Sequence, residues 1–144
     1  GPLPAWTTAV NTVDHYLWFA LKDPAVLPTT AVWASNKGRH SVPWRGRNRC
    51  LGLEDVCGYF AEGLAPSLRK NLLRDAGVPT AVKLSPRRPT VVNYIQGAVA
   101  VPRGFDRVRD ARFAAGSVTF RSYSNKTVTV PVCHAFLATG EPTA

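Results

Sequence analysis

The sequence predicts an all-β fold, an antiparallel β-sandwich with one short helix. Twelve prolines and 11 glycines are spread along the 144 residues, and such frequent turn residues favour short strands over long helices. The apolar runs are also short, and none reaches the roughly 18 residues that a membrane-spanning helix needs. Near the C-terminus, Val128, Val130 and Val132 alternate with Thr127 and Thr129, which is typical of a strand with one buried face.

The composition is that of a globular domain with a basic surface. Hydrophobic residues make up 45% of the chain and charged residues 19%, which excludes a disordered protein. Without internal repeats or a low-complexity linker, residues 1–144 are expected to form a single domain. Eighteen Lys and Arg residues against nine acidic residues give a formal net charge of +9. This charge fits an anionic partner, and equally a basic surface without one.

Several segments have the composition of strands, rich in β-branched and aromatic residues. These segments are residues 5–12, 16–22, 29–35, 79–84, 90–101, 117–123 and 126–133. Ser124 and Asn125 suit a hairpin turn between the last two. The run 90–101 lacks clean alternation, which indicates burial on both faces or a bend at Gly97.

Only residues 64–76 have helical features. Leu68, Leu72 and Leu73 fall at helical spacing, which predicts a core helix with one apolar face against the sheet. Gly77 follows as a stop signal.

Three cysteines, Cys50, Cys57 and Cys133, lack the paired spacing of a zinc site. Reduced and mostly buried thiols in the cytoplasm are the simplest interpretation. No Ser-His-Asp arrangement, phosphate loop or metal-ligand spacing occurs either, so the sequence predicts neither a metal nor a cofactor.

Residues 36–49 form the segment that is most distinctive chemically. Residues 36–48 hold four cations and no acid, and Arg49 adds a fifth. The apolar residues 50–53 then lead to Glu54, which we expect at the end of a buried strand. Partial desolvation there would make the carboxylate a better base near neutral pH, whereas the nearby arginines would keep it ionised.

The polar and aromatic side chains around Glu54 suit a sugar. An aromatic ring can stack on the apolar face of a pyranose, while Arg, Asn and His side chains bond its hydroxyls. The predicted substrate-binding residues are Asn36, Arg39, His40, Trp44, Arg47 and Tyr59. The plainer interpretation is a salt-bridged Glu54 beside a solvated basic loop, with Trp6, Trp18 and Trp33 in the core.

The same region resembles a bacterial group of proteins that looks like part of the galactose mutarotase-like (aldose 1-epimerase-like) superfamily. The residues that carry the resemblance are Val32-Trp33, Ser35-Asn36, Gly38-Arg39, Pro43-Trp44, Gly46-Arg47 and Gly52-Leu53-Glu54-Asp55. Glu54 matches the position of the superfamily's catalytic base. The run Leu84-Ser85-Pro86-Arg87, followed by residues 90–101, is similar to the turn and long strand that come next.

The resemblance implies the C-terminal part of a β-supersandwich over residues 6–137, so we expect a portion of a larger mutarotase-like fold. It also implies an isomerase that interconverts the anomers of a hexose or a phosphorylated hexose without a cofactor. The base takes the anomeric hydroxyl proton, and a histidine protonates the ring oxygen. No residue of this chain matches that histidine.

Two alternatives stay open. The first is a sugar-binding module without catalysis, which needs no histidine. The second, less favoured, is a basic nucleic-acid-binding protein, for which no RNA-recognition, helix-turn-helix or zinc-finger pattern is present. An incomplete sandwich would leave strand edges open, so a homodimer is also expected.

Overall fold

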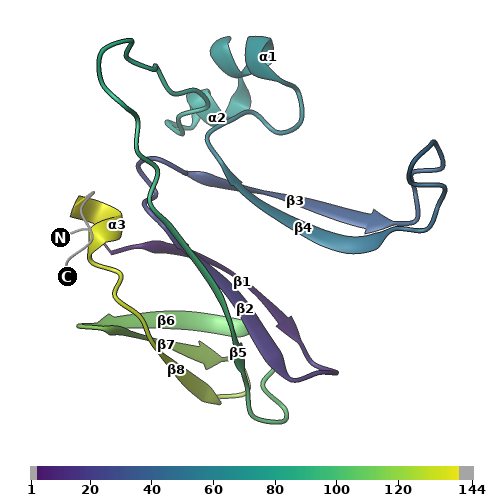
Figure 1. Cartoon of the computed structure of the whole chain (residues 1–144), viewed down its shortest axis with the longest axis vertical. Helices are drawn as coiled ribbons and strands as arrows, with labels where there is room; N and C mark the ends of the chain where they lie inside the picture. The colour runs from purple at the N-terminus through teal and green to yellow at the C-terminus, as the bar shows by residue number, and fades with distance from the viewer. Residues whose placement is uncertain (1–2, 140–144) are drawn as a thin grey trace. The chain divides into compact units, whose positions relative to one another are not determined.

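The computed structural model describes residues 3–139 and is mostly β, with three antiparallel sheets and only short helices (Figure 1). The elements are β1 (Ala5–Asn11), β2 (Tyr16–Lys22), β3 (Thr29–Asn36), β4 (Arg49–Val56), α1 (Leu64–Leu68), α2 (Leu72–Asp75), β5 (Tyr94–Ala100), β6 (Val108–Ala114), β7 (Ser117–Ser122), β8 (Thr127–Pro131) and α3 (Phe136–Thr139). The predicted all-β, sandwich-type fold class is confirmed. The chain divides into two compact units, residues 3–24 with 87–139 and residues 25–86.

The first unit contains a sandwich of two three-stranded sheets, in the orders β1-β2-β5 and β6-β7-β8. Side chains from both sheets fill the core, and the rings of Phe19 and Phe120 meet with centroids 5.2 Å apart. In β7, buried Val118, Phe120 and Ser122 alternate with half-buried neighbours, as a strand with one core face requires. Residues 117–123 and 126–133 do form the expected hairpin, with Asn125 at a positive φ of 62° in its turn.

Three predictions about strands differ from the structure. Residues 79–84 form no strand, because Thr80 is buried through hydrogen bonds to the backbone of Ser67 and the side chain of Asn71. Conversely, β6 was not predicted. In β5 the burial alternates along most of the strand. Of the two interpretations of residues 90–101, burial on both faces is therefore wrong.

The second unit is built on one antiparallel hairpin, in which β3 pairs with β4 from Thr29 opposite Val56 to Asn36 opposite Arg49. The predicted helix over residues 64–76 is instead two short helices. The Asn71 side chain accepts a hydrogen bond from the backbone N–H of Arg74, so it caps α2 and begins a new helix there.

The predicted apolar helix face is also not buried. Leu68 and Leu72 are exposed, and the buried residues of this region are polar. Ser67, Asn71 and Thr80 are joined by hydrogen bonds of 2.6 to 3.2 Å that reach each other or the adjacent backbone. Hydrogen bonding, rather than a leucine stripe, therefore holds α1 and α2 together.

The cysteines are all free, but they are not mostly buried as expected. Cys50 and Cys133 are exposed and Cys57 is half-buried, where burial raises the pKa of its thiol. No helix within residues 3–139 has the length and apolar character needed to cross a membrane.

Candidate functional site

The β3–β4 hairpin has two faces that differ in chemistry. Paired residues of an antiparallel ladder point to the same side, so the pairs Ala31–Glu54 and Trp33–Gly52 share one face. We call this side the Trp33 face. The missing side chain at Gly52 gives room to the indole, since a Cβ atom there would lie 3.3 Å from Cε3 of Trp33.

Glu54 lies within β4 rather than beyond its end, and its side chain is exposed. The expected setting at the end of a buried strand is therefore wrong. No partner within the described residues forms a hydrogen bond or ion pair with its carboxylate. The carboxylate is thus available to a ligand that approaches the Trp33 face.

The loop between β3 and β4 is closed by its own backbone hydrogen bonds. Lys37 N–H donates to the carbonyl of Asn48 at 3.0 Å, and Gly46 N–H donates to that of Arg39 at 2.8 Å. Gly46 has a φ of +65°, which favours glycine at this tight turn. These bonds give the cationic loop a defined fold beside the hairpin.

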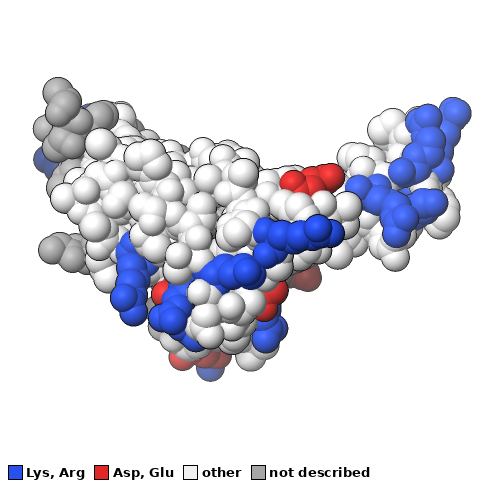
Figure 2. All heavy atoms as spheres, turned by 90° about the horizontal axis from the view of Figure 1, so that it is seen from below, with Lys and Arg blue, Asp and Glu red and all other residues white. Residues whose placement is uncertain are grey.

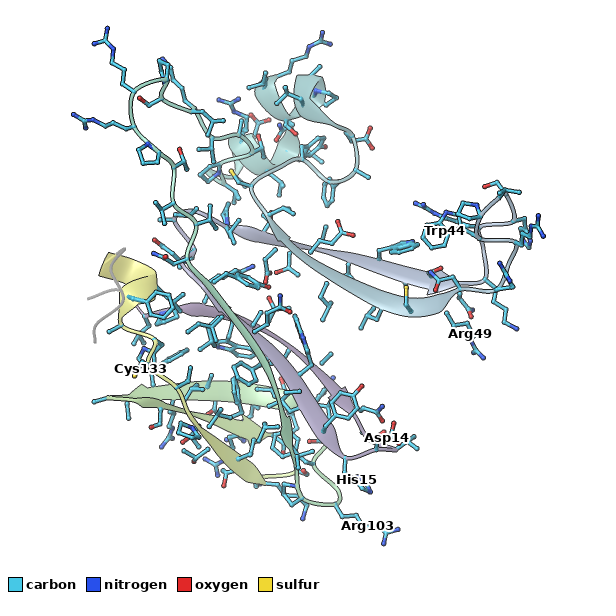
Figure 3. The ribbon with its side chains drawn as sticks, viewed as in Figure 1. Asp14, His15, Trp44, Arg49, Arg103 and Cys133 are labelled. Atoms are coloured by element: carbon cyan, nitrogen blue, oxygen red, sulfur yellow. The ribbon has the colours of Figure 1, made fainter. Side chains whose placement is uncertain are left out.

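Arg39 lies against two indole rings. Its guanidinium carbon is 4.9 Å from the ring centroid of Trp33 and 5.6 Å from that of Trp44, within cation–π range. The two rings meet edge to face, with centroids 6.0 Å apart. In Figure 3, Trp44 and Arg49 extend to opposite sides of the β3–β4 ribbon. The indoles therefore fix the Arg39 side chain over the Trp33 face.

These side chains line a hollow of about 730 Å³, a size typical of small-molecule sites. Its lining residues are Thr30, Ala31, Val32, Trp33, Arg39, Trp44, Glu54, Phe60 and Ala61. A second hollow of about 390 Å³ shares Ala31, Glu54 and Phe60 with it and extends toward Ser67 and Val82. Glu54 and Phe60 thus stand at the boundary between two adjoining hollows.

Three of the seven predicted site residues are brought together in the larger hollow: Arg39, Trp44 and Glu54. The other four line neither hollow on the Trp33 face. The imidazole of exposed His40 packs toward Gly46, and Arg47 donates a hydrogen bond from Nη2 to the carbonyl of Pro43 at 3.4 Å.

Asn36 and Tyr59 were also expected at the site. Asn36 pairs with Arg49 at the loop end of the hairpin. Tyr59 packs against Phe60 with ring centroids 5.1 Å apart, and its backbone N–H donates to Ser67 Oγ. The predicted direct roles of Asn36, His40, Arg47 and Tyr59 are therefore not supported by their positions.

Two lining residues were missed. Trp33 was expected in the core because most strand tryptophans lie there, yet it lines the hollow and lies beside Gly52. Phe60 is 65% exposed and has a φ of +48°, a strained conformation for a bulky residue. The glycine opposite Trp33 was the available sequence signal for the first, and none indicated the second.

The electrostatic setting is cationic. Lysines and arginines gather at the right-hand end of Figure 2, where the loop between β3 and β4 lies. The cations of this loop and its edge are Lys37, Arg39, Arg45, Arg47 and Arg49. In the described part of the chain, no group of three or more His, Cys, Asp and Glu side chains could hold a metal ion.

Comparison of the chain with protein-family models, with curated proteins and with solved structures gives no match. Membership of the mutarotase-like superfamily therefore stays a prediction, and the function has to be argued from the site itself.

Proposed function

We propose that the Trp33 face of the hairpin binds a sugar, a hexose or a hexose phosphate. The observation that carries the proposal is the hollow in which Arg39, Trp44 and Glu54 meet. It combines an aromatic lining with one guanidinium and one carboxylate. A pyranose has the matching chemistry, because its C–H faces are apolar and its hydroxyls both donate and accept hydrogen bonds.

The hydrogen-bonding capacity of the site supports this choice. Like the Glu54 carboxylate, the Arg39 side chain makes no hydrogen bond to the described part of the chain, so both can be satisfied by a ligand. Arg39 offers only donors and Glu54 only acceptors. A ligand with adjacent hydroxyl groups can pair with both, which a purely anionic ligand cannot do.

The loop favours a phosphorylated sugar within this class. Lys37 and Arg45 are exposed in the same loop as Trp44, and cationic side chains, guanidinium groups above all, bind phosphate strongly. The free cysteines suit a reducing compartment, so a cytoplasmic location belongs to the same proposal.

Interconversion of hexose anomers is the second candidate, and the free Glu54 carboxylate favours it. In this reaction Glu54 takes the proton of the anomeric hydroxyl, the C1–O5 bond breaks, and the ring oxygen is protonated. Ring closure on the other face of C1 gives the other anomer and returns the proton. No histidine lines the described hollow, so water is the acid available to the ring oxygen, and binding is the primary proposal.

Tryptophan fluorescence and polarimetry test both candidates. Titration with galactose, glucose and glucose 6-phosphate is expected to quench the indole fluorescence. Trp44→Ala should weaken binding by about tenfold, which corresponds to ~1.4 kcal/mol. Glu54→Gln should retain most of the binding but lower anomer interconversion by about 100-fold, the scale of a general base.

Glu62→Gln is the matched control, because Glu62 is an exposed carboxylate of the same unit that lines neither hollow. Unchanged polarimetry in Glu54→Gln would refute the catalytic role. Absence of quenching by all three sugars would refute the binding proposal. Quenching by single-stranded DNA that weakens steeply with salt would instead support nucleic-acid binding.

A further inference from the structure

The outer face of the β6-β7-β8 sheet is polar, and its side chains form two rows across the three strands. The rows are Asp110, Arg121 and Thr127, and Arg112, Thr119 and Thr129. These positions alternate with core residues such as Phe120, so their side chains point away from the core. We call this side the Arg121 face. It belongs to the sandwich unit, and none of its residues lines the hollows of the β3–β4 hairpin.

A small hollow of about 150 Å³ lies on the Arg121 face. The residues that line it are Asp110, Arg112, Thr119, Arg121, Asn125 and Thr127. Ordinary small-molecule pockets begin at roughly 300 Å³, so this hollow suits one small chemical group rather than a whole ring-containing ligand. Because every lining residue is polar, that group must be charged or rich in hydrogen-bonding atoms.

A β-bulge engages the one carboxylate of the hollow. The register of the ladder shifts between Val108 and Asp110, which makes Arg109 an extra residue. Arg109 Nε donates to Asp110 Oδ2 at 3.2 Å, and its Nη1 donates to Asn125 Oδ1 at 3.4 Å. Asp110 is therefore paired with Arg109 and not with Arg121, although Arg121 stands opposite it in the ladder.

The two arginines of the hollow retain their donors. Arg112 and Arg121 form no hydrogen bond or ion pair with the described part of the chain, and the buried Nε of Arg121 has no partner there. The two residues occupy diagonal positions on adjacent strands, a separation of roughly 7–8 Å that long side chains span. Two cations at this distance repel each other, and an anion between them turns the repulsion into attraction.

Threonine hydroxyls complete the set of donors. The Oγ1 atoms of Thr119 and Thr129 share a hydrogen bond of 2.8 Å, which holds the Thr119 side chain in place. The Thr127 hydroxyl makes no hydrogen bond to residues 3–139. It is therefore available to donate to a ligand that lies between the two guanidinium groups.

We propose that this hollow binds a single phosphate group, either the free ion or the monoester of a small molecule. Each guanidinium fork can bind two oxygens of a phosphate, and a hydroxyl can donate to a further one. The tetrahedral group presents enough oxygens for Arg112, Arg121 and Thr127 together. A carboxylate has only two oxygens in one plane, so it matches these three donors less well.

An NMR titration of the full chain with inorganic phosphate tests the proposal. The backbone amides of Arg112, Arg121 and Thr127 should shift in a saturable way, with a dissociation constant of about 1 mM. Acetate should bind at least about tenfold more weakly. Methyl phosphate distinguishes the two sources, because equal affinity indicates a site for a monoester and much weaker affinity a site for the free ion.

Substitution of either arginine removes one fork of donors. Arg112→Gln and Arg121→Gln should each weaken phosphate binding by about tenfold. Arg121→Lys keeps the charge without the fork and should recover only part of that loss. The matched control is Arg107→Gln, since the Arg107 guanidinium carbon lies 4.3 Å from the ring centroid of Tyr123 and the residue does not line the hollow.

Three results would overturn the proposal. The first is the absence of saturable shifts with both phosphate and methyl phosphate. The second is acetate binding as tightly as phosphate. The third is an equal loss of affinity in Arg107→Gln and Arg121→Gln, because net charge alone would then account for the binding. The dispersion of the amide spectrum of each variant separates weak binding from unfolding.

The sugar proposal is read separately in the same spectra. Phosphate held by the cationic loop of the hairpin shifts the amides of residues 37–47, whereas phosphate on the Arg121 face shifts those of β6, β7 and β8. Shifts confined to the loop would overturn the present inference and leave the sugar proposal standing. Shifts in β6, β7 and β8 without sugar quenching of tryptophan fluorescence would do the reverse.

Discussion

The carboxylate of Asp106 ties two loops of the sandwich together. Its Oδ1 accepts a hydrogen bond from the backbone N–H of Ser124 at 3.1 Å, and the Ser124 hydroxyl donates to the carbonyl of Gly104 at 2.8 Å. The backbone hydrogen bond from Ser124 is the largest cause that holds the pKa of Asp106 below its ordinary value. The ionised form is thus stabilised in the folded state.

The lowered pKa of Asp106 predicts how the stability of the fold depends on pH. The folded pKa of Asp106 is lower than the unfolded one, so the stabilisation is complete above the unfolded value of ~3.9 and is lost as pH falls through the folded value. Between pH 7 and pH 2, denaturant unfolding should show the parent losing more stability than Asp106→Asn. The two proteins should converge at the acid end. Equal slopes for both would contradict the assignment.

At the scale of the strand, Gly97 shows how the sandwich core limits side-chain size. Gly97 on β5 pairs with Phe19 on β2, and a Cβ atom there would lie only 2.8 Å from Cζ of the Phe19 ring. The ring cannot move freely, because it also packs against Phe120 in the core. The glycine therefore makes space for an aromatic neighbour across the ladder.

Gly97→Ala should consequently destabilise the protein by about 1–3 kcal/mol, the usual cost of overpacking a core. Gly58→Ala is the control, since its new Cβ atom would meet nothing within 4 Å. Chemical denaturation of both variants measures the difference. Equal stability of the two alanine variants would mean that Phe19 relaxes without cost.

The sequence predicted the strands in which β-branched and aromatic residues are frequent. It missed β6, whose outward side chains are long and charged. β2, β3 and the β7–β8 hairpin were identified from their β-branched and aromatic residues. In β6, Val108, Ala111 and Phe113 pack against the core cluster, while Arg109, Asp110 and Arg112 lie between them. Because these charged residues interrupt the apolar ones, the alternation of buried and exposed positions in β6 was not recognised in the sequence.

The candidate site could be predicted only in part from the sequence. The sequence indicated a cationic, aromatic loop followed by a carboxylate, and Arg39, Trp44 and Glu54 do meet. Which loop side chains turn toward the hairpin depends on the bonds that close the loop, such as that from Gly46 N–H to Arg39. These tertiary contacts produce no periodic pattern in the sequence. The sequence therefore could not show that Arg39 lines the hollow while His40 and Arg47 do not.

On the scale of the whole molecule, the two units differ in what they bury. Every buried hydrophobic residue of the described chain lies in residues 3–24 or 87–139, and most belong to one cluster around Phe19, Phe105 and Phe120. The buried residues of 25–86 are polar: Ser35, Ser67, Asn71 and Thr80. Because burial of apolar surface is the main stabilising term in folding, the two units should differ in local stability.

Hydrogen exchange of backbone amides tests this difference. The strands β2 and β7 carry buried core residues, so their amides should exchange only on global unfolding and therefore most slowly. The amides of β3 and β4 should exchange faster, through local opening of the hairpin. Hairpin amides as slow as those of β2 would contradict this argument, because the hairpin would then be as stable as the sandwich core without buried apolar residues of its own.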